Sequence, residues 1–318
     1  MRTAEIGRYW SVALRILAVA AFYYGAARLG LLQQLVGGQV TPLWPPTGVA
    51  LAGLLVFGLR IWPGIALGAF LVNVSIGPTA LAVLAIVAGN TAAPVCAYLM
   101  LRRTDFRDRL DRLRDVLALV FLGALAGMLI SATVGTGVLV LSGALDAGDF
   151  WPTWSVWWTG DAMGVLVVTP FLLALRRFRW PPKARPRRWI EATALLLGTL
   201  FATILATGTT SAALLFLVFP FLIWAAIRFQ LAGAATCALG VSTLAILAAA
   251  RQSGPFADLD LFADMVTLQA FNGTTALTAL LLAAVITERN ETHEEIKRLC
   301  ARLAEMVAEI EPRRDREG

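Results

Sequence analysis

Ten apolar segments follow one another along this chain of 318 residues, and they constrain its fold more than any other feature. A helix that crosses the hydrocarbon core of a bilayer needs about 20 consecutive, mostly apolar residues. The segments are residues 9–29, 43–59, 61–76, 79–101, 116–142, 154–175, 190–208, 212–227, 231–250 and 264–287. Because backbone polar groups must be paired within lipid, such runs predict helices. We therefore expect an all-α fold, a polytopic integral membrane helical bundle of about ten transmembrane helices.

The second, third and eighth segments are shorter than a full span, which leaves another topology open. In that alternative, eight helices cross the membrane and two segments are re-entrant. The charged residues favour ten helices. With the N-terminus in the cytoplasm, the arginine-rich residues 102–115 and 176–189 fall on the same side as the C-terminal tail, while Asp146 and Asp149 fall on the other. Since cytoplasmic connections carry the excess of Lys and Arg, both termini are predicted to be cytoplasmic.

The composition excludes several classes of protein. Apolar residues make up 58% of the chain and charged residues 15%, whereas soluble domains have roughly 45–50% and about 25%. A soluble enzyme and a disordered chain are both poor matches. The net charge of +6 comes from short basic clusters between apolar runs, so we expect a lipid bilayer and no nucleic acid as partner. One histidine and three scattered cysteines predict neither a metal site nor a disulfide, and we expect no cofactor.

One unusual motif opens the second segment and reads LWPPTG, residues 43–48. Two prolines suit a helix start, where the first backbone N–H groups have no partner within the helix. The motif is therefore either a helix-start device at the membrane interface or the rigid outer rim of a ligand cavity. In the second case, Trp44 and Thr47 are candidate ligand-binding residues.

A second motif places a carboxylate inside the sixth segment, where Asp161 follows Trp157, Trp158 and Gly160. A carboxylate within the bilayer is costly and usually faces the bundle interior or a wet cavity. Asp161 is therefore either paired to a neighbouring helix by a structural hydrogen bond or part of a ligand, ion or proton site lined by the tryptophans. Gly160 and Gly164 form a small face that allows another helix to approach closely.

Amide side chains inside other apolar segments complete the candidate site. Asn73 and Asn90 lie in the third and fourth segments, and Gln269 and Asn272 lie in the last. Such side chains commonly join helices by hydrogen bonds. The alternative is that Asn73 and Asn90 contribute to ligand binding together with Asp161.

We divide the chain into a membrane domain, residues 1–290, and a cytoplasmic helix with a tail, residues 291–318. In the second part, apolar residues recur at alternating intervals of three and four, the pattern of a coiled coil. They are Ile296, Leu299, Leu303, Met306 and Ile310. We expect this stripe to continue the last membrane helix as a short coiled-coil-like signalling helix and to form a parallel homodimer. The alternative is an amphipathic helix that lies on the inner leaflet.

Four stretches of the chain resemble the membrane-associated sensor domain family, type one. They are LWPPTGVALAGLLVFGLRIWPGIALGAFLVNV (43–74), AGN (88–90), WWTGDAMGVLVVTPFLLAL (157–175) and FPFLIWAAIRFQLAGAA (219–235). The resemblance covers about residues 9–290 and implies an integral membrane sensory domain of a bacterial signalling protein, located in the inner membrane. It also implies a sensor rather than an enzyme, because family members feed histidine kinases, diguanylate cyclases or cyclic-di-GMP phosphodiesterases.

From these observations we expect a signal-transduction domain. A small ligand of unknown identity would be received at the outer face or within the membrane, and the last span would carry the signal to a cytoplasmic kinase or cyclic-di-GMP output partner. Two alternatives remain open at this point. A small-molecule transporter would also use proline-opened helices and an intramembrane carboxylate, and a membrane scaffold protein would need no cavity near Asp161.

Overall fold

The computed structural model describes residues 2–32, 41–178, 186–257 and 261–314, and it contains no β-strand within these ranges. The α-helices are α1 (Arg2–Leu31), α2 (Pro45–Phe57), α3 (Trp62–Asn73), α4 (Ala80–Arg102), α5 (Leu113–Ala118), α6 (Leu129–Leu141), α7 (Phe150–Met163), α8 (Thr169–Arg177), α9 (Pro186–Thr207), α10 (Phe219–Ala250) and α11 (Leu261–Arg314). Short 3-10 helices are η1 (Leu59–Ile61), η3 (Ala147–Asp149), η5 (Ala212–Val218) and η6 (Gly254–Phe256). The π-helices η2 (Leu119–Ala126) and η4 (Gly164–Val168) join α5 to α6 and α7 to α8.

Helical structure covers every predicted apolar segment, and the expected all-α membrane architecture is confirmed at this level. Seven helical stretches of the described chain are long and apolar enough to cross a membrane, and the apolar helices α2 and α3 are shorter. The protein is therefore a multi-pass membrane protein, and its exact number of spans stays a prediction.

One of the seven stretches, Ala212–Ala250, folds back on itself at Gln230. That residue leaves the helical region at φ 50° and ψ −140°. A Cβ added to Gly233 would lie 3.1 Å from the carbonyl oxygen of Ala225, whereas residues eight apart in a straight helix are separated by about 12 Å. The two arms of α10 therefore form a helical hairpin, which matches the two segments predicted for this region.

Both arms of this hairpin pack along α9. The ring of Phe221, from the first arm, lies against Gly198. The hydroxyl of Thr199 donates to the Sγ of Cys237, from the second arm, at 3.6 Å. Neighbouring residues of α9 thus contact both arms at the same height, which requires that the arms run side by side.

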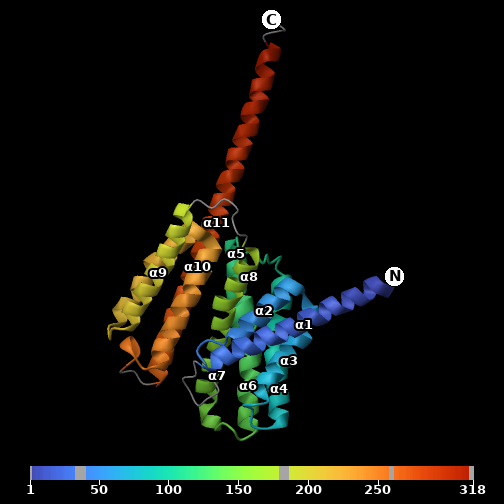
Figure 1. Ribbon diagram of the computed structural model, residues 1–318, viewed down its shortest axis with the longest axis vertical. Coiled ribbons are helices and arrows are strands. Elements are labelled where there is room, and N and C mark those ends of the chain that lie inside the picture. The colour runs from blue at the N-terminus through green and yellow to red at the C-terminus, as the bar shows by residue number, and fades with distance from the viewer. Residues whose placement is uncertain (1, 33–40, 179–185, 258–260, 315–318) are drawn as a thin grey trace.

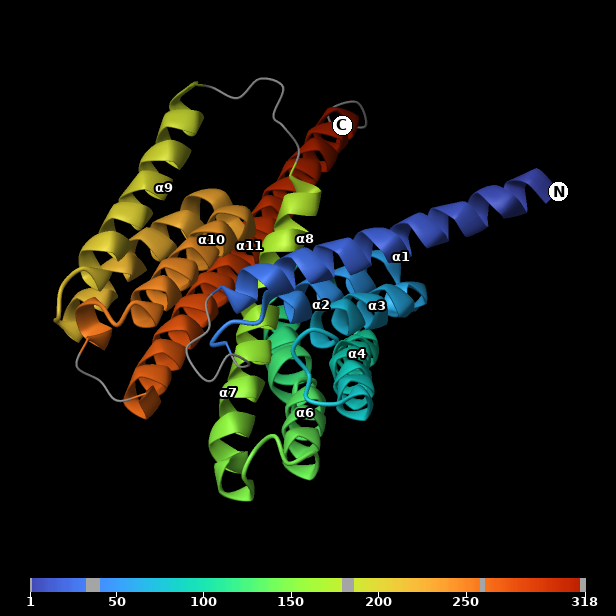
Figure 2. The ribbon, with the colours of Figure 1, turned by 60° about the horizontal axis from the view of Figure 1, so that its bottom comes forward.

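The helices form two groups that α7 and α8 connect (Figures 1 and 2). The first group contains α1 to α4, with α1 packed across α2 and α3. The second contains α9, α10 and α11, in which α10 and α11 share an extensive contact. The C-terminal part of α11 continues well beyond all other helices (Figure 1). The expected continuity between the last span and the tail is thus present, since α11 is a single helix of 54 residues.

The α10 hairpin predicts the sidedness of three exposed positions. In a background in which the native cysteines are replaced, Asp149→Cys and Arg251→Cys should react with a membrane-impermeant maleimide on intact cells. Ala232→Cys, beside the turn at Gln230, should react only after permeabilisation, because that end of the bundle carries the arginines. Labelling of Ala232→Cys and Arg251→Cys from the same side would contradict a hairpin that crosses the membrane twice.

Candidate functional site

The LWPPTG motif is held against the second motif by a backbone hydrogen bond. The N–H of Trp44 donates to the carbonyl oxygen of Gly160 at 3.0 Å. The helix α2 begins directly afterwards at Pro45, where the missing proline N–H leaves no donor unpaired. The start of α2 is therefore held against α7 by the backbone alone.

Three glycines make the contact of α2 with α7 and the following η4 unusually close. A Cβ on Gly160 would lie 2.4 Å from the carbonyl oxygen of Thr41, and one on Gly164 would lie 2.1 Å from that of Trp44. On the other side of the interface, a Cβ on Gly48 would lie 2.2 Å from the oxygen of Gly164. Only glycine permits this approach, so the small face expected at Gly160 and Gly164 packs against α2 and the residues before it.

Asp161 lies at the junction of three helices and is 2% exposed. Its Oδ1 accepts a hydrogen bond of 2.6 Å from the hydroxyl of Thr47 in α2. Its Oδ2 accepts one of 2.5 Å from the hydroxyl of Ser131 in α6. Hydrogen bonds from such donors strongly stabilise a carboxylate in a low-dielectric interior. Asp161 therefore faces protein and not lipid, with Thr47 as one of its partners.

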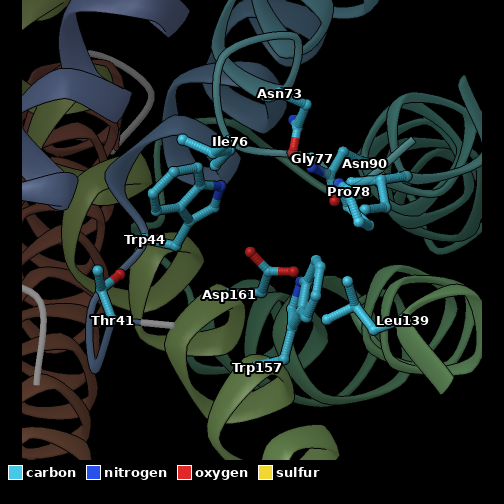
Figure 3. A pocket seen from close by; sticks show the side chains of 11 residues that line it. Thr41, Trp44, Asn73, Ile76, Gly77, Pro78, Asn90, Leu139, Trp157 and Asp161 are labelled. Carbon is cyan, nitrogen blue, oxygen red and sulfur yellow. The ribbon is translucent and has the colours of Figure 1, made fainter. Parts of the chain in front are cut away.

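A cavity of about 40 Å³ opens beside the Asp161 carboxylate (Figure 3). The indoles of Trp44 and Trp157 flank the carboxylate, and the amides of Asn73 and Asn90 lie on the opposite side. The remaining lining residues are Thr41, Ile76, Gly77, Pro78, Ile86 and Leu139. A space of this size holds a few water molecules or an ion. It is too small for a sugar or a drug-sized ligand, which occupies several hundred Å³.

The structure thus brings together six of the seven predicted ligand-binding residues: five line the cavity, and Thr47 does not line it but donates to Asp161. Trp158 is the exception. Its indole N–H donates to the carbonyl oxygen of Leu125 at 2.8 Å, and its ring stacks on Trp154 at 5.5 Å between centroids. Trp158 is therefore part of the packing between α7 and η2 and does not line the cavity.

Two contributors with polar side chains, Ser131 and Thr41, were not predicted from the sequence. Ser131 lies in a run of small and apolar residues, and no motif marks it as a partner of Asp161. Thr41 precedes the LWPPTG motif, and its hydroxyl donates to the carbonyl oxygen of Leu43 at 2.9 Å. A polar residue within an apolar run was the one available signal for Ser131.

The segment before α2 also contacts α11. The Nε2 of Gln269, in α11, donates to the carbonyl oxygen of Pro42 at 2.9 Å. One turn further along α11, Asn272 is 1% exposed, and neither atom of its amide has a partner within the described chain. Thr275 is also buried, and its hydroxyl has no partner there. The buried face of α11 is thus polar between Gln269 and Thr275.

At the other end of α11, the predicted stripe is uncovered in a single chain. Ile296, Leu299, Leu303 and Met306 are each more than half exposed. Ile310 belongs to the helix, but its side chain lies outside the described residues.

No group of three or more His, Cys, Asp or Glu side chains within the described chain could hold a metal ion.

These features define a class of protein: an all-helical, multi-pass membrane bundle with a carboxylate cavity among its helices and one helix that leaves the bundle. Comparison with known families agrees with this class. The chain belongs to the MASE1 family, whose profile matches residues 14–290, and this family is a membrane-associated sensor domain found in bacterial signalling proteins.

Among characterised proteins, the chain is similar to the probable diguanylate cyclase DgcE of Escherichia coli strain K12. The two are 27% identical over 224 residues, which cover 67% of this chain and 19% of the relative. The chain therefore corresponds to about a fifth of that protein's length. No solved structure matches the chain.

The glycine contact predicts a large difference between two alanine substitutions. Gly164→Ala should lower the thermal stability of the purified protein, because its Cβ would overlap the carbonyl oxygen of Trp44. Forcing a methyl group into a packed interior costs about 1–3 kcal/mol. Gly137→Ala in α6 is the matched control, since nothing lies within 4 Å of its added Cβ. Equal melting temperatures for the two variants would contradict the close approach of η4 to the start of α2.

Proposed function

We propose that the chain is the sensory input domain of a signalling protein, that it receives a small polar cue in the cavity beside Asp161, and that α11 carries the response to the cytoplasm. One observation supports this most directly: the segment Thr41–Leu43 lines the cavity through Thr41 and binds α11 through Pro42. In this proposal the chain senses and transmits and does not itself catalyse a reaction.

The chemistry of the cavity supports a cue of a few heavy atoms with cationic character. Asp161 supplies a carboxylate whose two oxygens are already oriented by Thr47 and Ser131. Trp44 and Trp157 present aromatic rings on either side of it, and such rings attract cations. The volume of about 40 Å³ restricts the occupant to a small ion or molecule.

The polar face of α11 supports a second arrangement of this helix. Asn272 and Thr275 are buried without hydrogen-bond partners in the described structure, and an unpaired buried polar group costs about 1–3 kcal/mol. A shift or rotation of α11 that paired these groups would recover part of this cost. Two arrangements close in free energy are the physical requirement for a helix that switches.

The output side of the proposal follows from the tail. The exposed apolar stripe of α11 pairs with the same stripe of a second copy as a parallel coiled coil in the cytoplasm, with both termini on that side of the bacterial inner membrane. Similarity to a probable diguanylate cyclase favours a cyclic-di-GMP output partner over a kinase of a two-component system.

A fusion of this chain to a diguanylate cyclase domain provides the functional test. Gln269→Leu removes the hydrogen bond to Pro42, and one such bond is worth about 1 kcal/mol. We therefore expect a change of roughly fivefold in the balance between active and inactive forms, measured as cellular cyclic-di-GMP at equal expression. Asp161→Asn should change the output in the same assay, because it alters the charge at the cavity.

Thr274→Val and Asp146→Asn are the controls for this experiment. Thr274 is exposed on α11, and its hydroxyl donates to the carbonyl oxygen of Ala270 in the same helix. Asp146 is exposed before η3. Cyclic-di-GMP levels that are the same in all four variants and in the unmodified fusion would contradict the proposed signalling route.

The tail predicts a crosslinked dimer. Cys300 is exposed and adjoins Leu299 on α11, so mild oxidation should join two copies through Cys300. Leu299→Asp and Leu303→Asp should suppress the crosslink, because they place charges in the apolar seam. A crosslink yield that these charges leave unchanged, or a monomer in gentle detergent, would rule out the coiled coil.

A further inference from the structure

A second, larger cavity lies far from Asp161, between α8, α9 and α10. Its volume is about 590 Å³, a size typical of sites for small organic molecules. It lies at the end of the bundle where α8 ends and α9 begins, beside the hairpin turn at Gln230. None of its lining residues belongs to the first cavity.

Most of the residues that line this cavity are apolar. Phe171 and Leu175 line it from α8, and Leu195 and Leu196 line it from α9. Leu175 is 57% exposed. Because it lies on a helix of a membrane bundle, the medium to which it is exposed is lipid. An apolar groove on this surface is therefore accessible to an acyl chain from the bilayer.

The mouth of the cavity is basic. Arg109, Arg177 and Arg188 line it, and they come from three different segments of the chain. Arg177 is paired with Asp108 at 2.6 Å, and the guanidinium of Arg188 lies 5.9 Å from the ring centre of Phe229. Asp111 is the single acidic residue among those that line the cavity. The charge at the mouth is thus positive and suits a phosphate group.

We propose that this cavity binds an anionic phospholipid, phosphatidylglycerol, with its phosphodiester at the arginines and an acyl chain along the apolar wall. Free phosphate would use the arginines but not the wall. Phosphatidylcholine would use the wall, but its quaternary ammonium group offsets the charge of its phosphodiester and is repelled by the arginines. Basic pockets between helices at the cytoplasmic side of membrane proteins hold anionic headgroups for the same physical reason. This inference does not depend on the cue proposed for the first cavity.

The position of the groove gives the lipid a contact with α11. Thr287, which lies where α11 leaves the bundle, lines the same cavity as the arginines. An occupant of the groove therefore touches the hairpin turn of α10 and the exit of α11 together.

Native mass spectrometry of the purified full-length chain tests the proposal. The protein is titrated in detergent with phosphatidylglycerol, with phosphatidylcholine of the same acyl chains, and with glycerol 1-phosphate. We expect selective retention of phosphatidylglycerol. In the double variant Arg109→Gln and Arg188→Gln its affinity should fall by roughly fivefold for each arginine removed. Arg103→Gln, an exposed arginine that does not line the cavity, should bind like the unmodified chain.

A second pair of variants tests the acyl-chain groove without changing any charge. Ala192→Phe should fill the groove and weaken binding, since Ala192 lines the cavity. Ala194→Phe on the same helix is exposed and outside the cavity, so it should have no effect. Arg109→Lys with Arg188→Lys keeps the charge and should retain selectivity for phosphatidylglycerol over phosphatidylcholine.

Three results would overturn the proposal. Equal retention of phosphatidylglycerol and phosphatidylcholine would show that the arginines do not select a headgroup. Unchanged binding in the Ala192→Phe variant would place the lipid elsewhere. Displacement of phosphatidylglycerol by glycerol 1-phosphate would identify a phosphate site to which the groove contributes nothing.

Discussion

A carboxylate inside a membrane bundle needs donors, and the pairing of Asp161 determines how three helices meet. Thr47 in α2 and Ser131 in α6 each bind one of its oxygens. These hydroxyls can reach Asp161 because the glycines at the interface allow α2 and α7 to touch through their backbones. The cavity is the space left beside this junction, so its shape depends on the same contacts. Loss of the close approach would unpair the carboxylate and destroy the cavity together.

The helices were predictable because apolar length and backbone pairing in lipid leave few alternatives. The position of the carboxylate in the interior was predictable for the same energetic reason. The residues that surround this carboxylate were harder to predict. Trp157 and Trp158 are neighbours in the sequence, yet adjacent residues of a helix point about 100° apart. Only Trp157 faces the cavity, while Trp158 packs toward Leu125. A sequence motif shows which residues are unusual, but not which face of the helix each one occupies.

The number of spans illustrates another limit. A minimum length of about 20 residues applies to a helix surrounded by lipid, but α2 is largely buried by other helices. Burial within protein removes the need for a full-length apolar run, so length alone cannot decide between a span and a re-entrant segment. The turn at Gln230 adds a further difficulty, because it reverses the chain without a proline or glycine at the turn itself. The apolar stripe of α11 was predicted from the spacing of its residues along the chain. The partner that would cover this stripe is a property of the assembly and not of one chain.

The second cavity is lined by a residue of α11, and the first is connected to α11 through Pro42, so the two cavities have a physical means of influencing each other. Gln269 connects α11 to the segment beside the first cavity, and Thr287 lines the second. These residues lie about 27 Å apart along one continuous helix, at 1.5 Å per residue. A helix of this kind moves as a unit, so occupants that favour different positions of α11 must compete. By linkage, the effect of the lipid on the affinity for the cue equals the effect of the cue on the affinity for the lipid. Under this proposal the lipid composition of the inner leaflet sets the threshold at which the protein responds.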